Sequence, residues 1–462
     1  MNHAPFQSLN ESVLDRLQAL VGAEHISVSE ADLAQYAGDM SGHEPCRAEA
    51  VVWPGTAEEV AAILKLASEQ RVPVTAWGAG TSLEGNPIPV HGGILLSMHR
   101  MQAIIAIHDA DFQVTVQPGI GYKDMNSQLA RYGLFFAPDP GANATIGGML
   151  ANNAAGIRTV KYGACKDNVL RIQVALPDGR LIHCGSRSVK QASGYDLLHL
   201  FVGSEGTLGV ITEATLKLAP IARHASAVVA NFPTVEAAVE AVVAVRGSGL
   251  GPAALEFIDA HHARMLSQSG DVNLGALPVL FMEFHAANRK VLEMDLDLVR
   301  EICAECDALD VRATSAPAER RRLWHARHHA YENALRNHPG ESFVIVDVVV
   351  PISHYPQLVA HVERTLEKHS KTGYMIGHAG DGNLHVLLPF SDKDSYQDAL
   401  GLNQSIVEKA LALDGTATGE HGVGIGKARY MSQEHGAALD VMRSLKQLLD
   451  PAGIMNPGKI FP

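Results

Sequence analysis

Residues 72–86, VPVTAWGAGTSLEGN, place a short apolar strand directly before a glycine-rich loop. Upstream, AVVWP (50–54) is typical of another strand, and EEVAAILKLASEQ (58–70) carries apolar residues at helical spacing. Strand, helix and strand in this order form one βαβ unit. The glycines let the loop backbone approach a ligand closely, and consecutive N–H groups can cradle a diphosphate. The stretch therefore predicts a nucleotide-type cofactor loop.

The glycine-rich loop differs from two common nucleotide motifs. G-x-G-x-x-G would require glycine where Leu83 stands, and no G-K-[ST] follows. A nicotinamide site of Rossmann type is therefore disfavoured. The loop alone is weak evidence, but further small-residue segments follow it, which indicates a long ligand in an extended groove: 118–119, 138–141, 145–149, 152–156 and 203–209.

Composition indicates an ordinary globular protein of two or three folding units. The 462 residues are 47% hydrophobic and 19% charged, and a net charge of -13 argues against nucleic-acid binding. No apolar stretch approaches the ~20 residues of a membrane-spanning helix. The beginning resembles neither a secretory signal nor a transit peptide, so we expect a cytoplasmic protein, with peripheral docking at the inner membrane left open. Five scattered cysteines give no disulfide framework.

The order and spacing of the predicted strands and helices change near residue 220. The first half is α+β, with PDG (177–179) as a hairpin turn, whereas strands and helices of the second half have the spacing of a split-βαβ sandwich. Among the later helices we expect one over about 288–307 and one over about 318–336.

The segment GHAGDGNLHV (377–386) is a candidate metal site. A four-residue turn would oppose His378 to His385 and place both imidazoles on one face, with β-carbons ~4.5–5.5 Å apart. In TGEHGVG (418–424), an extended backbone would point Glu420 and His421 to opposite sides, so that one completes a two-His, one-carboxylate site while the other faces a substrate. Zinc fits such ligands, and manganese or iron would be accommodated too.

Arg327 is a candidate anion-binding residue. It lies between Trp324 and Tyr331, so it can form a bidentate clamp for a carboxylate. We interpret the arginines at 320–322 as solvated helix surface.

Several motifs, in order from about residue 50 to the end, resemble the FAD-dependent D-2-hydroxy-acid dehydrogenases. These are relatives of vanillyl-alcohol oxidase and p-cresol methylhydroxylase, and include FAD-linked D-lactate, D-2-hydroxyglutarate and glycolate dehydrogenases. The motifs are WPGTAEEV, GAGTSLEGN, VQPG, PDPGANATIGGMLANNAAG, KYG, GSEGTLGVIT, HAGDGNLH, TGEHGVG and NPGKIF.

The resemblance implies an α+β fold with an FAD-binding domain of the p-cresol methylhydroxylase type and a ferredoxin-like cap that supplies the substrate site. We expect an N-terminal helical segment (1–50) packed on the FAD domain (51–220), a cap with the metal site (221–430) and a C-terminal segment returning to the FAD domain (431–462). The implied cofactor-binding residues are Pro54, Gly78, Ala79, Gly80, Thr81, Ser82, Gly85, Asn86, Pro118, Gly119, Pro138, Asp139, Thr145, Ile146, Gly148, Asn152, Ala154, Gly206, Ile211 and Asn456.

The resemblance also implies roles in the second half of the chain. His378, His385 and Glu420 match metal ligands, and His421 matches the catalytic base. Arg327 matches the residue that anchors the substrate carboxylate; the other residues expected to contact substrate are Tyr331 and Asn383. Because no His or Cys occurs from Gly78 to Asn86, where covalent members carry a histidine, we expect non-covalent FAD.

The implied substrate is a monocarboxylic D-2-hydroxy acid such as D-lactate. Hydroxyglutarate members place a Thr after the Arg and a Lys in the following strand, where this chain has Tyr331 and the apolar residues around Asp347. A second carboxylate would therefore lack its cation. D-2-hydroxyglutarate and glycolate stay as alternatives within the family.

The sequence contains no motif for an iron–sulfur, haem or nicotinamide site. Electrons are therefore expected to pass to an external acceptor, such as a quinone, a cytochrome or an electron-transfer flavoprotein. A homodimer is left open. Two other classes compete: a metal-dependent hydrolase, which leaves the glycine-rich loops unused, and a flavin-binding module or flavin reductase without hydroxy-acid turnover.

Overall fold

The computed structural model describes residues 5–268 and 272–462. The chain folds as two compact units. Unit 1 consists of the chain up to Ala155, Ala164–Ile221 and Glu420–Pro462; unit 2 consists of Gly156–Gly163 and Ala222–Gly419. Among the described helices, none is both long and apolar enough to cross a membrane.

The first sheet of unit 1 contains the predicted βαβ unit. Its order is β1 (Ile26–Ser27), β2 (Ala50–Val52), β4 (Ile94–Ser97) and β3 (Val74–Trp77), with β2 and β3 each parallel to β4. Helix α3 (Ala57–Gln70) connects β2 to β3, and Thr56 caps its N-terminus with a hydroxyl that accepts the Glu59 N–H. Its apolar face and that of α1 (Glu11–Val21) share one core with this sheet. A short helix, α2 (Glu30–Gln35), precedes β2.

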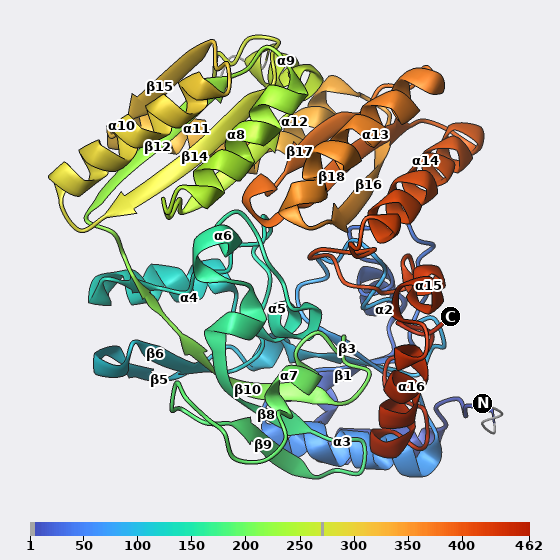
Figure 1. Cartoon of the computed structure of the whole chain (residues 1–462). Helices are drawn as coiled ribbons and strands as arrows, with labels where there is room; N and C mark the ends of the chain where they lie inside the picture. Colours follow the sequence, from blue (N-terminus) through green and yellow to red (C-terminus); the bar gives the residue numbers. More distant parts are fainter. Residues whose placement is uncertain (1–4, 269–271) are drawn as a thin grey trace. The chain divides into compact units, whose positions relative to one another are not determined.

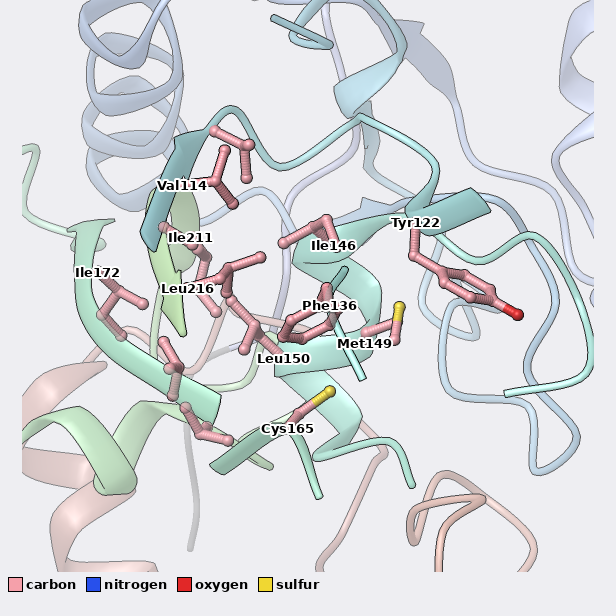
Figure 2. Packing of buried hydrophobic residues seen from close by; sticks show 14 of the residues in the cluster. Val114, Tyr122, Phe136, Ile146, Met149, Leu150, Cys165, Ile172, Ile211 and Leu216 are labelled. Atoms are coloured by element: carbon pink, nitrogen blue, oxygen red, sulfur yellow. The ribbon is translucent and has the colours of Figure 1, made fainter. Parts of the chain in front are cut away.

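The second sheet of unit 1 is antiparallel, in the order β5 (Ile104–His108), β6 (Gln113–Val116), β10 (Val210–Lys217), β8 (Val169–Ala175) and β9 (Leu181–Gly185). The predicted turn joins β8 to β9, with Gly179 at φ 85°. Figure 2 shows side chains of this sheet packed against helix α5 (Ile146–Asn152), including Ile172, Ile211 and Leu216. The remaining elements here are α4 (Tyr122–Leu129), α7 (Leu198–Phe201) and the pair β7 (Leu134–Phe135) and β11 (Ala219–Pro220).

The C-terminal segment completes the first sheet. After α15 (Met431–His435) and α16 (Ala438–Leu449), the chain runs parallel to β3. The Val74 N–H donates to the Ile454 carbonyl at 2.8 Å, and the Asn456 N–H donates to the Val74 carbonyl at 2.8 Å. Residues far apart in sequence are therefore joined beside the glycine-rich loop that follows β3.

Unit 2 is built on a seven-stranded antiparallel sheet (Figure 1). Its first four strands are β12 (His224–Asn231), β13 (Ala254–Ile258), β14 (Val279–Ala286) and β15 (Asp310–Thr314), in the order β15-β12-β14-β13 expected of a ferredoxin-like split-βαβ fold. Strands β17 (Tyr374–Gly377), β18 (Asn383–Phe390) and β16 (Ser342–Val349) extend the sheet beyond β13.

Helices cover both faces of the unit 2 sheet. Helices α8 (Val235–Gly247), α10 (Arg289–Glu305), α13 (Tyr355–Lys368) and α14 (Lys393–Ala412) pack side by side, as Figure 1 shows. Helices α9 (Ala260–Gln268) and α11 (Pro317–His328) share a core with Ile258, Phe281 and Ile376 of the sheet. The short helix α6 (Thr159–Tyr162) also belongs to this unit.

The helix predicted over 288–307 is confirmed as α10, whereas the single helix predicted over 318–336 is wrong. It is two helices, α11 and α12 (Ala330–Asn337), with His329 between them at φ -99° and ψ 24°. The apolar periodicity continues through the break, so the sequence pattern alone did not reveal it.

Candidate functional site

The glycine-rich loop after β3 has the features of an anion cradle. Residues 78–83 are half-buried or exposed, whereas Glu84, Gly85 and Asn86 are buried. Within the described part of the chain, the N–H groups of Gly80, Thr81 and Ser82 donate to no protein acceptor. Consecutive free N–H groups of this kind suit a diphosphate. These residues therefore fit the pyrophosphate of a dinucleotide.

Other predicted cofactor segments meet this loop. A β-carbon on Gly78 would come within 2.2 Å of the Thr145 hydroxyl, and one on Gly147 would come within 2.6 Å of the Pro118 side chain. Glycine is thus needed for close approach at both positions. The motifs GAGTSLEGN, VQPG and TIGGM consequently lie together in unit 1.

All the predicted cofactor-binding residues belong to unit 1. Ile146 is fully buried in the core shown in Figure 2, and its N–H donates to the Ile120 carbonyl oxygen at 2.9 Å, so this residue belongs to the core behind the groove. Ala154 and Ile211 belong to the same core, and Asp139 is buried. Asn456 donates its amide to the carbonyl oxygens of Asn86 at 3.0 Å and Glu205 at 2.8 Å.

Glu205 joins three motifs and was missed in the sequence. Its carboxylate accepts the N–H groups of Val423 at 2.6 Å and Gly424 at 2.8 Å, and the Asn86 amide at 2.6 Å. Burial raises the pKa of Glu205 above its ordinary value, although these donors oppose the rise. The sequence feature that could have identified Glu205 is that it is the one acid in the small-residue segment GSEGTLG. Its carboxylate fixes the loop that follows His421.

The His421 backbone is also attached to a predicted cofactor residue. The Asn152 side-chain amide donates to the His421 carbonyl oxygen at 3.1 Å. Both residues belong to unit 1. The candidate base is therefore carried by a loop bonded to α5, the helix of the TIGGM motif.

His378 and His385 flank the turn between β17 and β18. The predicted direct opposition of the two histidines is wrong: Ile376 lies opposite His385 in the ladder, because the 3-10 turn Ala379–Asp381 shifts the register by two residues. Since side chains alternate with a period of two, this shift keeps both imidazoles on one face. Their ring centroids are 5.4 Å apart.

Glu420 completes a group that could hold a metal ion. It is joined by one peptide bond to Gly419, the last residue of unit 2. One ligand atom each from His378, His385 and Glu420 lie within 4.8 Å of one another. Two imidazoles and a carboxylate at this separation suit zinc, manganese or iron.

Two buried carboxylates support this group. Glu256 accepts the His378 Nδ1–H at 2.8 and 2.9 Å, which leaves Nε2 for a metal. Asp347 lies opposite His385 in the β16–β18 pair, and its Oδ1 is 3.7 Å from His385 Nδ1. A carboxylate hydrogen-bonded behind a ligating histidine, as Glu256 is behind His378, is characteristic of metal sites, so the residues fit the ion.

Asp347 also holds the loop that leads to Glu420. Its Oδ2 accepts the Thr418 hydroxyl at 2.8 Å and the Gly419 N–H at 2.7 Å, and its Oδ1 accepts the Asn383 amide at 2.7 Å. Sequence reasoning assigned no site role to Glu256 or Asp347. The signal that could have found them is an acid inside an otherwise apolar strand.

Arg327 lies in α11 with its side chain 9% exposed and donates from Nη2 to Glu256. Burial alone would raise the pKa of Glu256, but the charges of Arg327 and His378 hold it below its ordinary value. Among the described residues, Arg327 Nε has no hydrogen-bond acceptor. An arginine buried with a free donor suits a small carboxylate ligand.

The other two predicted substrate residues differ in environment. Tyr331 lies in an apolar cluster, its ring edge-on to Phe343 with centroids 6.1 Å apart. Asn383 is buried and donates to Asp347 and to the Val348 carbonyl, while its Oδ1 has no donor among the described residues. Asn383 thus presents a polar group, whereas Tyr331 contributes mainly apolar surface.

Family models match both halves of the chain. Residues 48–185 match an FAD binding domain, and residues 221–460 match the C-terminal domain of FAD linked oxidases. The chain belongs to the FAD-linked oxidases. In this FAD-linked oxidase, the first match covers the glycine-rich segments from 78–86 to 152–156, which the hydrolase alternative left unused.

Curated relatives of this FAD-linked oxidase span nearly its whole length. A probable mitochondrial D-lactate dehydrogenase of Danio rerio is 38% identical, covering 98% of this chain and 92% of the relative. A mitochondrial D-lactate dehydrogenase (cytochrome) of Arabidopsis thaliana is 40% identical, covering 90% and 73%. The glycolate oxidase subunit GlcD of Bacillus subtilis is 34% identical, covering 98% and 97%.

Solved structures of the same fold confirm the α+β architecture predicted for this FAD-linked oxidase. p-Cresol methylhydroxylase aligns with a TM-score of 0.77 at 15% identity, covering 98% of this chain and 97% of the other. The 4-ethylphenol oxidase of Gulosibacter chungangensis aligns with a TM-score of 0.81 at 16% identity, covering 99% of both chains.

Proposed function

We propose that the protein oxidises a D-2-hydroxy monocarboxylic acid, such as D-lactate, to the 2-keto acid. The observation that carries the proposal is the buried Arg327, joined through Glu256 to His378 of the candidate metal group. A 2-hydroxy acid carries a carboxylate next to a hydroxyl, and a cation beside a metal ligand suits that pair. The names of the fish and plant relatives support D-lactate.

The chain's own residues bind the substrate and move its proton. When bound, FAD accepts a hydride and a divalent metal lowers the pKa of a hydroxyl. Arg327 binds the carboxylate through its free guanidinium edge, which orients C2. His421 accepts the hydroxyl proton as general base. Asn383 offers its amide oxygen to the substrate, and FAD is held without a covalent bond by the loop of Gly78–Asn86.

A single carboxylate is favoured by the surroundings of Tyr331. The hydrophobic residues packed around Tyr331 include Phe343, Tyr374 and Leu387, and the Tyr374 hydroxyl is bonded to His338 at 2.6 Å. A second carboxylate placed against these hydrophobic side chains would lose hydration, and none of them carries a positive charge. D-2-hydroxyglutarate should therefore be a poorer substrate than D-lactate.

Glycolate is a second candidate, supported by the likeness to GlcD. It carries the same carboxylate and hydroxyl but lacks the methyl group. Reoxidation of the flavin is assigned to an external acceptor, such as a quinone, a cytochrome or an electron-transfer flavoprotein. The word cytochrome in the name of the plant relative supports a one-electron protein acceptor.

Anaerobic reduction of the purified holoenzyme tests the substrate. The protein is mixed separately with D-lactate, L-lactate, D-2-hydroxyglutarate and glycolate while the flavin absorbance is followed. We expect D-lactate to bleach the flavin fastest and L-lactate to leave it oxidised. Fastest bleaching by D-2-hydroxyglutarate, or none by any hydroxy acid, would refute the proposal.

A further inference from the structure

Glu256 is a charged residue in the middle of an apolar sheet. It lies on β13 with an exposed fraction of 0%, between the fully buried Leu255 and Phe257. On the β14 side its ladder partner is Phe281. An ionised carboxylate in such a place is costly unless its charge is compensated by close partners. Hydrophobic packing therefore gives no reason for an acid at this position.

The compensation comes from two different elements of unit 2. Both Glu256 oxygens accept the Nδ1–H of His378, which follows β17, and Oε2 also accepts Nη2 of Arg327 from α11. The β13–β17 register, which pairs Phe257 with Gly377, brings His378 opposite Glu256. One carboxylate is thus shared by a candidate metal ligand and the candidate substrate anchor.

Each bond of Glu256 fixes a property of its partner. Because Nδ1 of His378 carries its proton toward Glu256, Nε2 is the nitrogen available to a metal. Because Nη2 of Arg327 is held, the guanidinium has a set orientation with Nε still free for another acceptor. Loss of the Glu256 charge would disturb both groups together and leave a buried arginine without its counter-charge.

We propose that Glu256 is a positioning residue that couples metal retention to recognition of the substrate carboxylate. The inference rests on the proposed function for the identity of the carboxylate ligand. By thermodynamic reciprocity, a metal that orders His378 and Glu256 strengthens carboxylate binding at Arg327, and a bound carboxylate strengthens metal binding by the same factor. In the absence of the Glu256 charge, the part of this coupling that passes through Glu256 is lost.

Glu283 provides a matched control. It lies on the neighbouring strand β14, is 7% exposed and accepts a bond at 2.7 Å from another histidine, His285. The variants are therefore Glu256→Gln, which removes the charge at nearly constant volume, Glu256→Asp, which keeps it, and Glu283→Gln. Thermal unfolding of each flavin-loaded protein first establishes that it is folded.

Two affinities are then measured for each protein. Zinc affinity is determined by competition with a chromophoric chelator, and pyruvate affinity by calorimetry with and without zinc. We expect Glu256→Gln to weaken zinc binding by about 10–100-fold and to reduce the zinc dependence of pyruvate binding. Glu256→Asp should restore part of both effects, and Glu283→Gln should match the wild type.

Either of two results would overturn the inference: unchanged zinc affinity in Glu256→Gln, or pyruvate binding that depends on zinc equally in Glu256→Gln and the wild type. Flavin reduction of the wild type by D-lactate is scored separately. Its absence would refute the proposed substrate but would leave the comparison of zinc affinities intact, so the two failures are distinguishable.

Discussion

The side-chain amide of Asn152 donates a hydrogen bond to the backbone carbonyl oxygen of His421 at 3.1 Å. Asn152 ends the helix of the TIGGM motif, and His421 lies in the TGEHGVG loop, 269 positions later in the chain. The bond is made to the backbone, so it sets the position of the loop that carries the imidazole.

Removal of the Asn152 amide should slow turnover of the flavin-loaded protein. A neutral hydrogen bond contributes about 1 kcal/mol, so Asn152→Ala is expected to lower kcat by about five- to tenfold. The measurements are steady-state kinetics with D-lactate and the ratio of flavin to protein. Asn143→Ala, which removes an exposed amide of the same unit bonded to Asp124, is the control. Equal kcat in both variants would refute a positioning role for Asn152.

Loss of the His421 imidazole should abolish proton removal while FAD stays bound. We expect His421→Ala to be yellow and to reduce its flavin about 10²–10⁴-fold more slowly with D-lactate. Stopped-flow absorbance measures the rate. A reduction rate within twofold or so of the wild type would exclude His421 as the base.

Loss of the Glu420 carboxylate should act on metal content instead. With one of three ligands absent, Glu420→Ala is expected to contain much less zinc, manganese or iron than the wild type, and still to hold FAD. Elemental analysis of dialysed protein measures the metal content of Glu420→Ala and of His421→Ala, which serves as the comparison. Full metal content in Glu420→Ala would contradict the ligand set.

Loss of the Glu205 carboxylate should destabilise unit 1. Glu205→Ala leaves the N–H groups of the half-buried Val423 and the buried Gly424 without their acceptor, at a cost of up to about 1–3 kcal/mol for each. We expect a lower Tm and easier release of FAD, measured by flavin fluorescence during heating. Glu205→Gln keeps one acceptor oxygen and should be intermediate. A Tm of Glu205→Ala equal to the wild type would contradict this account.

Asp259 should make stability depend on pH. Burial raises the pKa of Asp259 to about 7, against its backbone donors, so the folded protein keeps a proton that the unfolded chain releases above an ordinary pKa near 4. Its contribution to stability therefore falls as pH rises between these two values.

Asp259→Asn removes this titration but keeps the oxygen that accepts the His262 N–H at 2.8 Å. The Tm of this variant minus that of the wild type should increase by several degrees from about pH 4 to about pH 8. A difference that is constant with pH would show that Asp259 is ionised at the same pH in the folded and unfolded states.

Local patterns were sufficient to predict the βαβ unit, the hairpin at 177–179 and the shared face of His378 and His385. They failed where a pattern continues through a change of conformation. The apolar periodicity around Arg327 continues across the break between two helices at His329. The turn after His378 contains a 3-10 helix, which shifts the pairing of β17 with β18 by two residues.

Glu205, Glu256 and Asp347 could not be placed from the sequence for a different reason. Each one is partnered by residues distant along the chain, so the function of its carboxylate depends on contacts that no local window contains. An acid within an apolar or glycine-rich stretch indicates that such partners exist, but not which residues they are.

Completion of the first sheet by residues 454–456 has a consequence for biosynthesis. Val74 leaves the ribosome long before Ile454 and Asn456, its hydrogen-bond partners at the edge of β3. Residues 222–419, which include all seven strands of the second unit, are translated in the interval. A nascent chain can thus form the sheet of the second unit before residues 454–456 are available to the first sheet. A stop codon before residue 454 would leave Val74 of β3 without these hydrogen-bond partners.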